Sequence, residues 1–166
     1  MRNSNGDWVK LAELTGRKPI VEVLDATIEQ VQFKVTYRLD ERGTGTFVGV
    51  KQANSIATVL VSEIFTITPI EVLVENSVQG AGISQMRVYY PMLISDGENE
   101  TDVQIDQSSL RLKLRDKNFL LEVLEPSATR LIRSKQKLNH RNGLVEPVYW
   151  NVDGNTARYR ISGGRP

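Results

Sequence analysis

The sequence predicts an all-β domain, an antiparallel two-sheet β-sandwich of about ten strands. Residues 31–39 alternate without exception between apolar side chains, such as Val31, Phe33 and Val35, and polar ones. This two-residue period is typical of a strand with one buried face. Weaker copies recur at 109–115 and 156–162. No helical pattern of 10–15 residues lies between the expected strands, which argues against a parallel βαβ arrangement.

The N-terminal segment is the one place where a helix is expected. Residues 7–16 favour a short helix with Asp7 as its N-cap and Gly16 as its stop, and an edge strand is the alternative. With 166 residues, the chain is most simply one domain spanning residues 1–166. Within it, residues 1–18 form a lead-in and residues 163–166 a tail.

Strands are expected at roughly even spacing along the chain, the pattern of a sandwich or barrel. Pro69 interrupts one apolar run because proline cannot donate to a sheet ladder. Residues 40–45, 79–82, 95–102 and 134–143 are loops by composition, and residues 116–118 are expected to form a hairpin turn. The expected strands are 20–24, 27–39, 46–51, 56–67, 70–74, 83–90, 103–105, 109–115, 119–124, 144–152 and 156–162.

Composition limits the function classes. The absence of cysteine excludes disulfides, thiolate metal sites and thiol nucleophiles, and no apolar run reaches the length of a membrane span. No apolar signal core follows Arg2. The net charge of +1 hides an asymmetry: residues 1–106 sum to −6 and residues 107–166 to +7. The basic part would suit an anionic polymer, whereas the favoured interpretation is two solvated faces of different composition.

An acidic segment is the first candidate site. Asp96, Glu98, Glu100 and Asp102 would offer oxygen ligands to Ca²⁺, although the glycine spacing does not match an EF-hand. A solvated turn is the favoured interpretation. The Gly80–Gly82 segment lacks the remaining glycine of a dinucleotide fingerprint and is not a phosphate loop.

The second candidate surrounds the only histidine, in the polar loop at 134–143. His140, Arg141 and Asn142 would bind a carboxylate or an acidic sugar, and Lys135 and Lys137 would add attraction. Asn142-Gly143 is also a preferred hairpin turn, so chain reversal alone explains this segment. His140 is a weak candidate for an acid or base, since no Gly-x-Ser-x-Gly elbow supports a triad.

Tyr149 and Trp150 are neighbours on one strand and must face opposite sides. One is expected in the core and the other at the surface. Both are candidate sugar-contact residues, because an exposed aromatic ring would stack on a sugar. The basic strands lack the combination of aromatic and basic residues that marks a nucleic-acid platform, so nucleic acid is not an expected partner. Nor is a membrane, since no apolar run is long enough to span one.

The second half of the chain resembles the C-terminal β-sandwich of heparinase-like polysaccharide lyases. The resemblance spans about residues 60–162 and rests on the order of three segments: 90–98 (YPMLISDGE), the hairpin 110–124 and 140–146 (HRNGLVE). In such enzymes the catalytic residues lie mostly on a separate helical toroid. The sandwich packs against it, forms one wall of the cleft and sometimes holds a metal. The resemblance would make His140 and Arg141 face a cleft.

The resemblance implies an accessory module of a polysaccharide-degrading enzyme that packs against a catalytic helical domain, contacts acidic glycan, or does both. It also implies a periplasmic or extracellular location. Two alternatives remain: a structural or interaction module without a carbohydrate ligand, and a stand-alone lyase or hydrolase that uses His140. The helical domain that carries the catalytic residues of heparinase-like lyases has no counterpart in this sequence, so catalysis by the chain alone is not expected.

Overall fold

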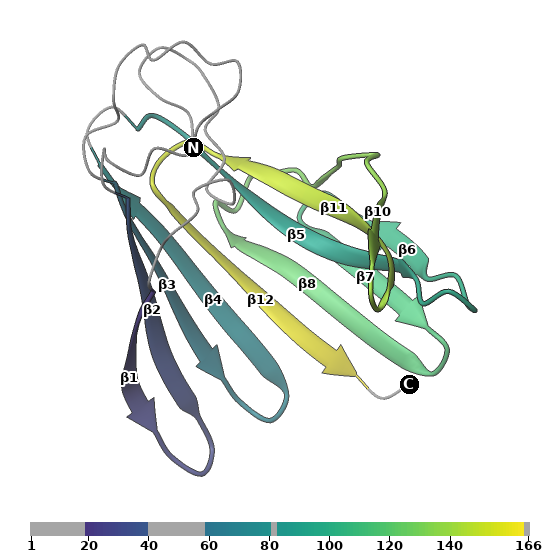
Figure 1. The fold of residues 1–166 in the computed structure, drawn as a ribbon, viewed down its shortest axis with the longest axis horizontal. Coiled ribbons are helices and arrows are strands. Elements are labelled where there is room, and N and C mark those ends of the chain that lie inside the picture. The colour runs from purple at the N-terminus through teal and green to yellow at the C-terminus, as the bar shows by residue number, and fades with distance from the viewer. Residues whose placement is uncertain (1–18, 40–58, 81–82, 165–166) are drawn as a thin grey trace.

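The chain folds into two antiparallel β-sheets, as the alternation predicts (Figure 1). The computed structural model describes residues 19–39, 59–80 and 83–164, and the helix expected at 7–16 and the strand expected at 46–51 lie outside them. The described residues contain twelve strands and no helix, and therefore no helix able to span a membrane. The strands are β1 (Ile20–Ala26), β2 (Val31–Leu39), β3 (Val59–Ile67), β4 (Glu71–Gln79), β5 (Met86–Ser95), β6 (Asp102–Ile105), β7 (Ser109–Leu114), β8 (Lys117–Glu125), β9 (Ile132–Arg133), β10 (Leu138–His140), β11 (Gly143–Val152) and β12 (Thr156–Gly164).

The larger sheet has eight strands in the order β1-β2-β3-β4-β12-β8-β7-β6. The last of the described strands, β12, thus lies in the middle, between β4 and β8. The smaller sheet has the order β10-β11-β5, with β9 also paired to β11. It lies over one half of the larger sheet, on the side of β8 and β12 (Figure 1).

The core lies between the smaller sheet and this half of the larger one. Trp150 of β11 packs edge-on against Tyr159 of β12, with ring centroids 5.3 Å apart. Tyr90 of β5 stacks on Phe119 of β8. Buried side chains from both sheets, and Leu131 just before β9, fill the remaining space. Those from the sheets are Val59, Val61, Val78, Met86, Met92, Leu110, Leu121, Val123, Val148, Val152 and Ala157. The two-sheet sandwich is therefore confirmed.

Several strand boundaries differ from expectation, each for a local reason. The strand expected at 27–39 begins only at Val31, because the hydroxyl of Thr27 closes a turn by accepting a hydrogen bond from the Gln30 N–H at 3.1 Å. The segment 134–143, expected as a loop, contains β10. The tail expected at 163–166 begins too early, since Gly163 and Gly164 pair with β8.

The strand expected at 83–90 runs on through Pro91 to Ser95. Pro91 lies directly opposite Pro147 of β11. Two prolines can face each other only at a non-hydrogen-bonded pair, where neither nitrogen would donate across the ladder. The register therefore lets β5 continue through a residue that usually ends a strand.

Candidate binding surfaces

His140, Arg141 and Asn142 lie at the exposed tip of the β10–β11 hairpin. His140 pairs with Gly143, so Arg141 and Asn142 form the two-residue turn, one position earlier than the expected Asn142-Gly143. Gly143 has a φ of 130°, and a Cβ there would lie 2.0 Å from the carbonyl oxygen of Ser95. The close approach of β5 therefore requires glycine at this position. Chain reversal is confirmed, and contact of these three residues with a ligand stays a prediction.

Behind this tip, a buried carboxylate holds the basic segment in place. The Glu146 side chain is only 2% exposed and accepts two hydrogen bonds from Arg133, one of them from Nε at 2.9 Å. The backbone N–H of Lys135, at a φ of 60°, also donates to Glu146, at 3.2 Å. The hydrogen bonds from Arg133 are the largest cause of a lowered pKa of Glu146. Glu146 therefore fixes the backbone that carries the exposed Lys135 and Lys137.

The acidic segment 96–102 is a turn that carries its own counter-charge. Asp96 accepts hydrogen bonds from the N–H groups of Asn99 and Glu98 at 2.7 and 3.0 Å, which lower the pKa of Asp96 more than Arg115 does. Arg115 forms ion pairs with Asp96 at 2.9 Å and Glu98 at 3.2 Å. Across residues 19–39, 59–80 and 83–164, no three acidic or histidine side chains converge into a possible metal site. A guanidinium thus lies where the calcium hypothesis placed the cation.

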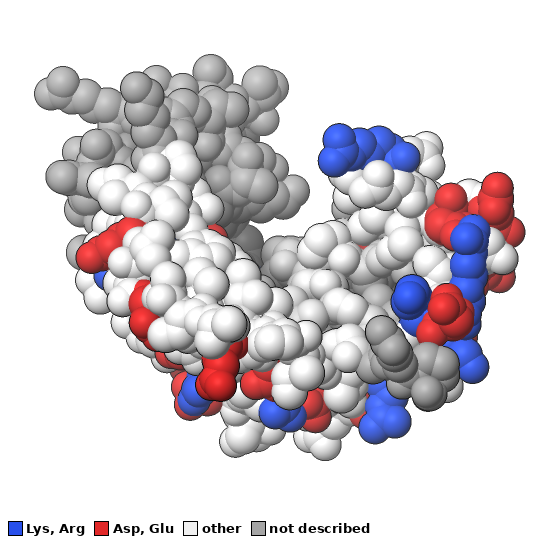
Figure 2. Space-filling view, turned by 90° about the horizontal axis from the view of Figure 1, so that it is seen from below, with Lys and Arg blue, Asp and Glu red and all other residues white. Residues whose placement is uncertain are grey.

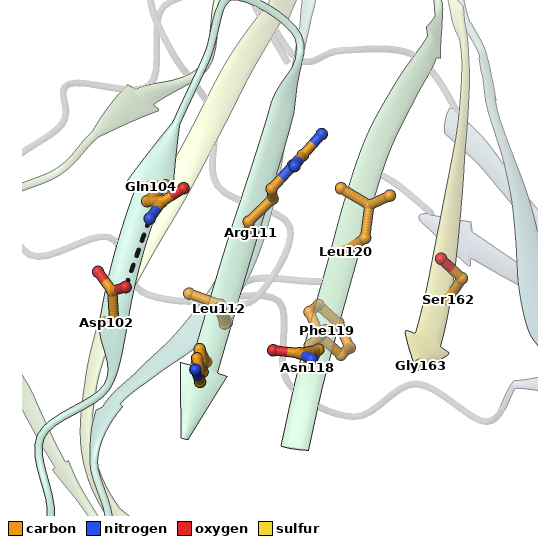
Figure 3. A pocket seen from close by; sticks show the side chains of 10 residues that line it. Asp102, Gln104, Arg111, Leu112, Asn118, Phe119, Leu120, Ser162 and Gly163 are labelled. Atoms are coloured by element: carbon orange, nitrogen blue, oxygen red, sulfur yellow. Dashed lines mark hydrogen bonds between the residues drawn. The ribbon is translucent and has the colours of Figure 1, made fainter. Parts of the chain in front are cut away.

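The other two acidic residues of that segment point elsewhere. Glu100 forms an isolated bridge with Ser95. Asp102 begins β6, where it accepts a hydrogen bond from Gln104 and faces Lys113 of β7. A shallow depression crosses β6, β7, β8 and β12 at this point, and polar side chains including Arg111, Asn118 and Ser162 line it (Figure 3). It is open to solvent and brings no set of catalytic groups together.

Trp150 and Tyr149 face opposite sides of β11, as expected. Trp150 is fully buried, so the prediction that it contacts a sugar is wrong: the pleat directs its indole into the core. Tyr149 lies on the solvent side of the smaller sheet, next to Tyr89 of β5 with ring centroids 5.3 Å apart. The hairpin tip is six residues away along β11, about 20 Å. The predicted sugar-contact residues therefore do not form one site.

The solvent side of the smaller sheet is apolar along most of its length. Cross-strand pairs bring its side chains into rows: Leu138 and Leu93 flank Val145, Ile132 and Tyr89 flank Tyr149, and Pro91 faces Pro147. We call these eight side chains the outer apolar face. Tyr89 is 50% exposed. A strand that is apolar on both sides is usually covered on both sides.

At one end of the outer apolar face, Arg87 contacts both Tyr149 and Tyr89. Its guanidinium lies 4.5 Å from the centre of the Tyr149 ring. Arg87 also donates hydrogen bonds to Asn151 at 2.8 Å and to the Tyr89 hydroxyl at 3.3 Å. The cluster combines flat aromatic surfaces, a cation and an amide, the groups that stack on and hydrogen-bond to sugars. Sequence reasoning noticed Tyr149 and missed Arg87, which is distant in sequence and meets Tyr149 only through strand pairing.

Comparison with known proteins links this fold to glycan-degrading enzymes. No protein-family model matches the chain, and no match is found among curated proteins. Among solved structures, the heparan sulfate lyase HepC from Pedobacter heparinus matches 88% of this chain with a TM-score of 0.60 and 9% sequence identity. A mutant of that enzyme matches with a TM-score of 0.58, and Heparinase III matches 90% of this chain with a TM-score of 0.52.

The match covers only a part of those enzymes. This chain spans about 22% of HepC and 21% of Heparinase III. At 9–11% identity the likeness is one of fold. It covers 88–90% of the chain, which is more than the expected residues 60–162. The chain therefore has a heparinase-like β-sandwich fold, which makes up about a fifth of the lyases that it resembles.

Proposed function

We propose that this chain is a non-catalytic accessory module that packs against a larger domain of a polysaccharide-degrading enzyme. The observation that carries this proposal is the outer apolar face. Eight apolar or aromatic side chains cover the side of the smaller sheet that points away from its core. Apolar patches of this kind on a folded domain mark surfaces that a partner covers.

The charges around this face support a protein partner. Arg87 lies at one end, and His140, Arg141 and Lys137 lie at or near the other. Interfaces commonly have an apolar, aromatic centre and a polar rim, with tyrosine and arginine enriched. The fold comparison agrees, because the matching region is a minor part of a longer lyase chain. A catalytic helical domain is the partner that the heparinase-like fold favours.

Contact with acidic glycan is a second proposal, favoured by a different observation. Tyr149 and Tyr89 form an exposed aromatic pair, and Arg87 and Asn151 provide hydrogen-bonding groups beside it. A uronate or sulfate would approach Arg87 while its sugar ring stacks on a tyrosine. Arg141, Lys135 and Lys137 would act at a distance, through charge, and contact of His140 and Asn142 with the glycan stays a prediction.

A pair of capture experiments tests the packing proposal. The tagged full chain is recovered from cells that produce it, as wild type and as the triple variant Tyr89→Ser/Ile132→Ser/Leu138→Ser. We expect the wild type to retain a polysaccharide-degrading enzyme, identified by mass spectrometry, and the triple variant to lose it. The matched control is Ile28→Ser/Ile70→Ser, which removes exposed isoleucines from turns of the larger sheet. Equal retention by wild type and triple variant contradicts the proposal.

Binding to heparan sulfate and to a neutral polysaccharide, at low and moderate salt, tests glycan contact. Saturable binding that survives moderate salt and is lost in Tyr149→Ala supports a stacking site. Binding that vanishes with salt and ignores Tyr149→Ala indicates only a diffuse basic surface. Turnover of either polymer by the chain alone, lost in His140→Ala, would contradict the non-catalytic assignment.

A further inference from the structure

Among the described strands, β1 forms one edge of the larger sheet. It pairs with β2 on one side and, among the described strands, has no neighbour on the other. All seven of its residues are exposed, including Val21 at 60% and Val23 at 66%. An exposed edge strand presents unpaired N–H and C=O groups that another strand can use.

The edges formed by β6 and β5 are protected in ways that β1 is not. The opposite edge strand, β6, has only four residues. The edge strand of the smaller sheet, β5, carries Pro91. By contrast, β1 has seven residues and contains neither proline nor lysine. A register shift between Val23 and Asp25 confines its regular part to Ile20–Val23, which suits a short segment.

The two sides of β1 differ in chemistry. Val21 and Val23 point to the core side, opposite Val35 and Phe33 of β2. The apolar surface continues beyond them, because Phe33 stacks on Phe65 of β3 with centroids 5.0 Å apart. On the other side Glu22 faces Lys34, and beyond the bulge Asp25 faces Gln32. An added strand would therefore place alternate residues beside valines and beside carboxylates.

The charge of this half of the sheet defines what can bind there. Residues 20–39 and 59–79 contain six acidic residues against Lys34 and Arg38. Figure 2 shows the same bias, with acidic side chains predominating on the left of the view and basic ones on the right. Two copies of β1 would bring like charges together, which opposes self-pairing. A basic segment is complementary.

We propose that β1 accepts an extended segment of a partner protein in which apolar residues alternate with Lys or Arg. The segment would pair with β1 as a ninth strand, a mode in which main-chain hydrogen bonds give affinity and alternate side chains give specificity. Its apolar residues would pack beside Val21 and Val23, and its basic residues would approach Glu22 and Asp25. This surface is distinct from the outer apolar face, so the inference stands or fails independently of the proposed packing.

A synthetic peptide provides the probe. The heptapeptide Ser-Leu-Arg-Leu-Lys-Leu-Arg, a copy of residues 109–115, has the required alternation. Hydrogen exchange of the full chain is measured with and without it. In the free chain, we expect alternate amides of β1, those not bonded to β2, to exchange rapidly. With the peptide, their exchange should slow by about tenfold or more. The control peptide has Glu in place of Arg and Lys and should give no protection.

Two variants test whether binding of the peptide at the β1 edge causes the slower exchange. Glu22→Lys/Asp25→Lys keeps the strand and should abolish protection by the basic peptide, while allowing the acidic peptide to protect. Ile132→Ser, on the outer apolar face, should change nothing. Equal protection by both peptides, or protection that survives the charge reversal, overturns the proposal. So does full protection of β1 in the free chain, which would mean that the chain covers this edge itself.

Discussion

The ion pair between Glu146 and Arg133 allows a quantitative test of how the backbone that carries Lys135 and Lys137 is held in place. Replacing Arg133 with methionine keeps most of the side-chain volume and removes the guanidinium. Glu146, 2% exposed, then keeps one hydrogen bond from the described residues, from the N–H of Lys135. Removing one partner of a buried ion pair costs roughly 3–5 kcal/mol. Because Arg133 is itself 44% exposed, solvent screens part of the pair, and we expect a loss near 3 kcal/mol.

The assay is chemical and thermal unfolding at neutral pH. A loss of about 3 kcal/mol should lower Tm by about 6–12 °C in a domain of this size. The matched control, Arg130→Met, alters a nearby exposed arginine and should change stability by less than about 0.5 kcal/mol. Arg133→Met/Glu146→Leu removes both charges and should recover most of the loss.

The pH dependence of the free energy of unfolding tests the direction of the pKa shift of Glu146. Arg133 holds the pKa of Glu146 below its ordinary value, so the pair stabilises the folded state above the unfolded-state pKa of about 4.3. This contribution is lost as pH falls through the folded-state pKa. The difference between wild type and Arg133→Met should therefore shrink under acidic conditions. A difference that stays constant down to strongly acidic pH, or a loss no larger than that of Arg130→Met, refutes the reasoning.

Three further predictions follow from the described geometry. Trp150→Ala should lower the free energy of unfolding by about 3–5 kcal/mol in denaturant titrations, because it leaves a cavity in the core. Tyr149→Ala, on the solvent side of the same strand, should lower it far less. Gly143→Ala should cost more than about 1 kcal/mol in the same assay, because its Cβ would lie 2.0 Å from the Ser95 carbonyl; wild-type stability would refute the close approach. In NMR titrations, Arg115→Ala should leave the pKa of Asp96 below its ordinary value, since the N–H groups of Asn99 and Glu98 are the larger cause; a full return to the ordinary value would contradict this order.

Alternation was sufficient to predict the fold class, because a two-residue period has few structural explanations. It also placed Tyr149 and Trp150 on opposite sides of one strand. It could not say which side is buried, since both sides of β11 are apolar. That ambiguity is why Tyr149 and Trp150 both remained candidates for sugar contact, although Trp150 lies in the core. The apolar residues on both sides of β11 are also the sequence feature that indicates the outer apolar face.

Turn positions and long-range partners were less predictable. The turn expected at 116–118 is formed by Arg115 and Asp116, with Arg115 at a φ of 57°, and the turn expected at Asn142-Gly143 is also shifted by one residue. In both hairpins the cross-strand register outweighs the local preference of asparagine and glycine for turns. The contacts of Arg133 with Glu146 and of Arg115 with Asp96 depend on sheet pairing, which a single sequence does not reveal.

The central position of β12 has a consequence for how the chain is made. During synthesis, β1 to β4 and β6 to β8 emerge from the ribosome before the strand that joins them. Until residues 156–164 are released, β4 and β8 each have an edge without its final neighbour. The larger sheet can therefore be completed only after residues 156–164 have left the ribosome, and until then two open edges can pair wrongly. Chaperone dependence of expression should accordingly concentrate on the interval before residues 156–164 emerge.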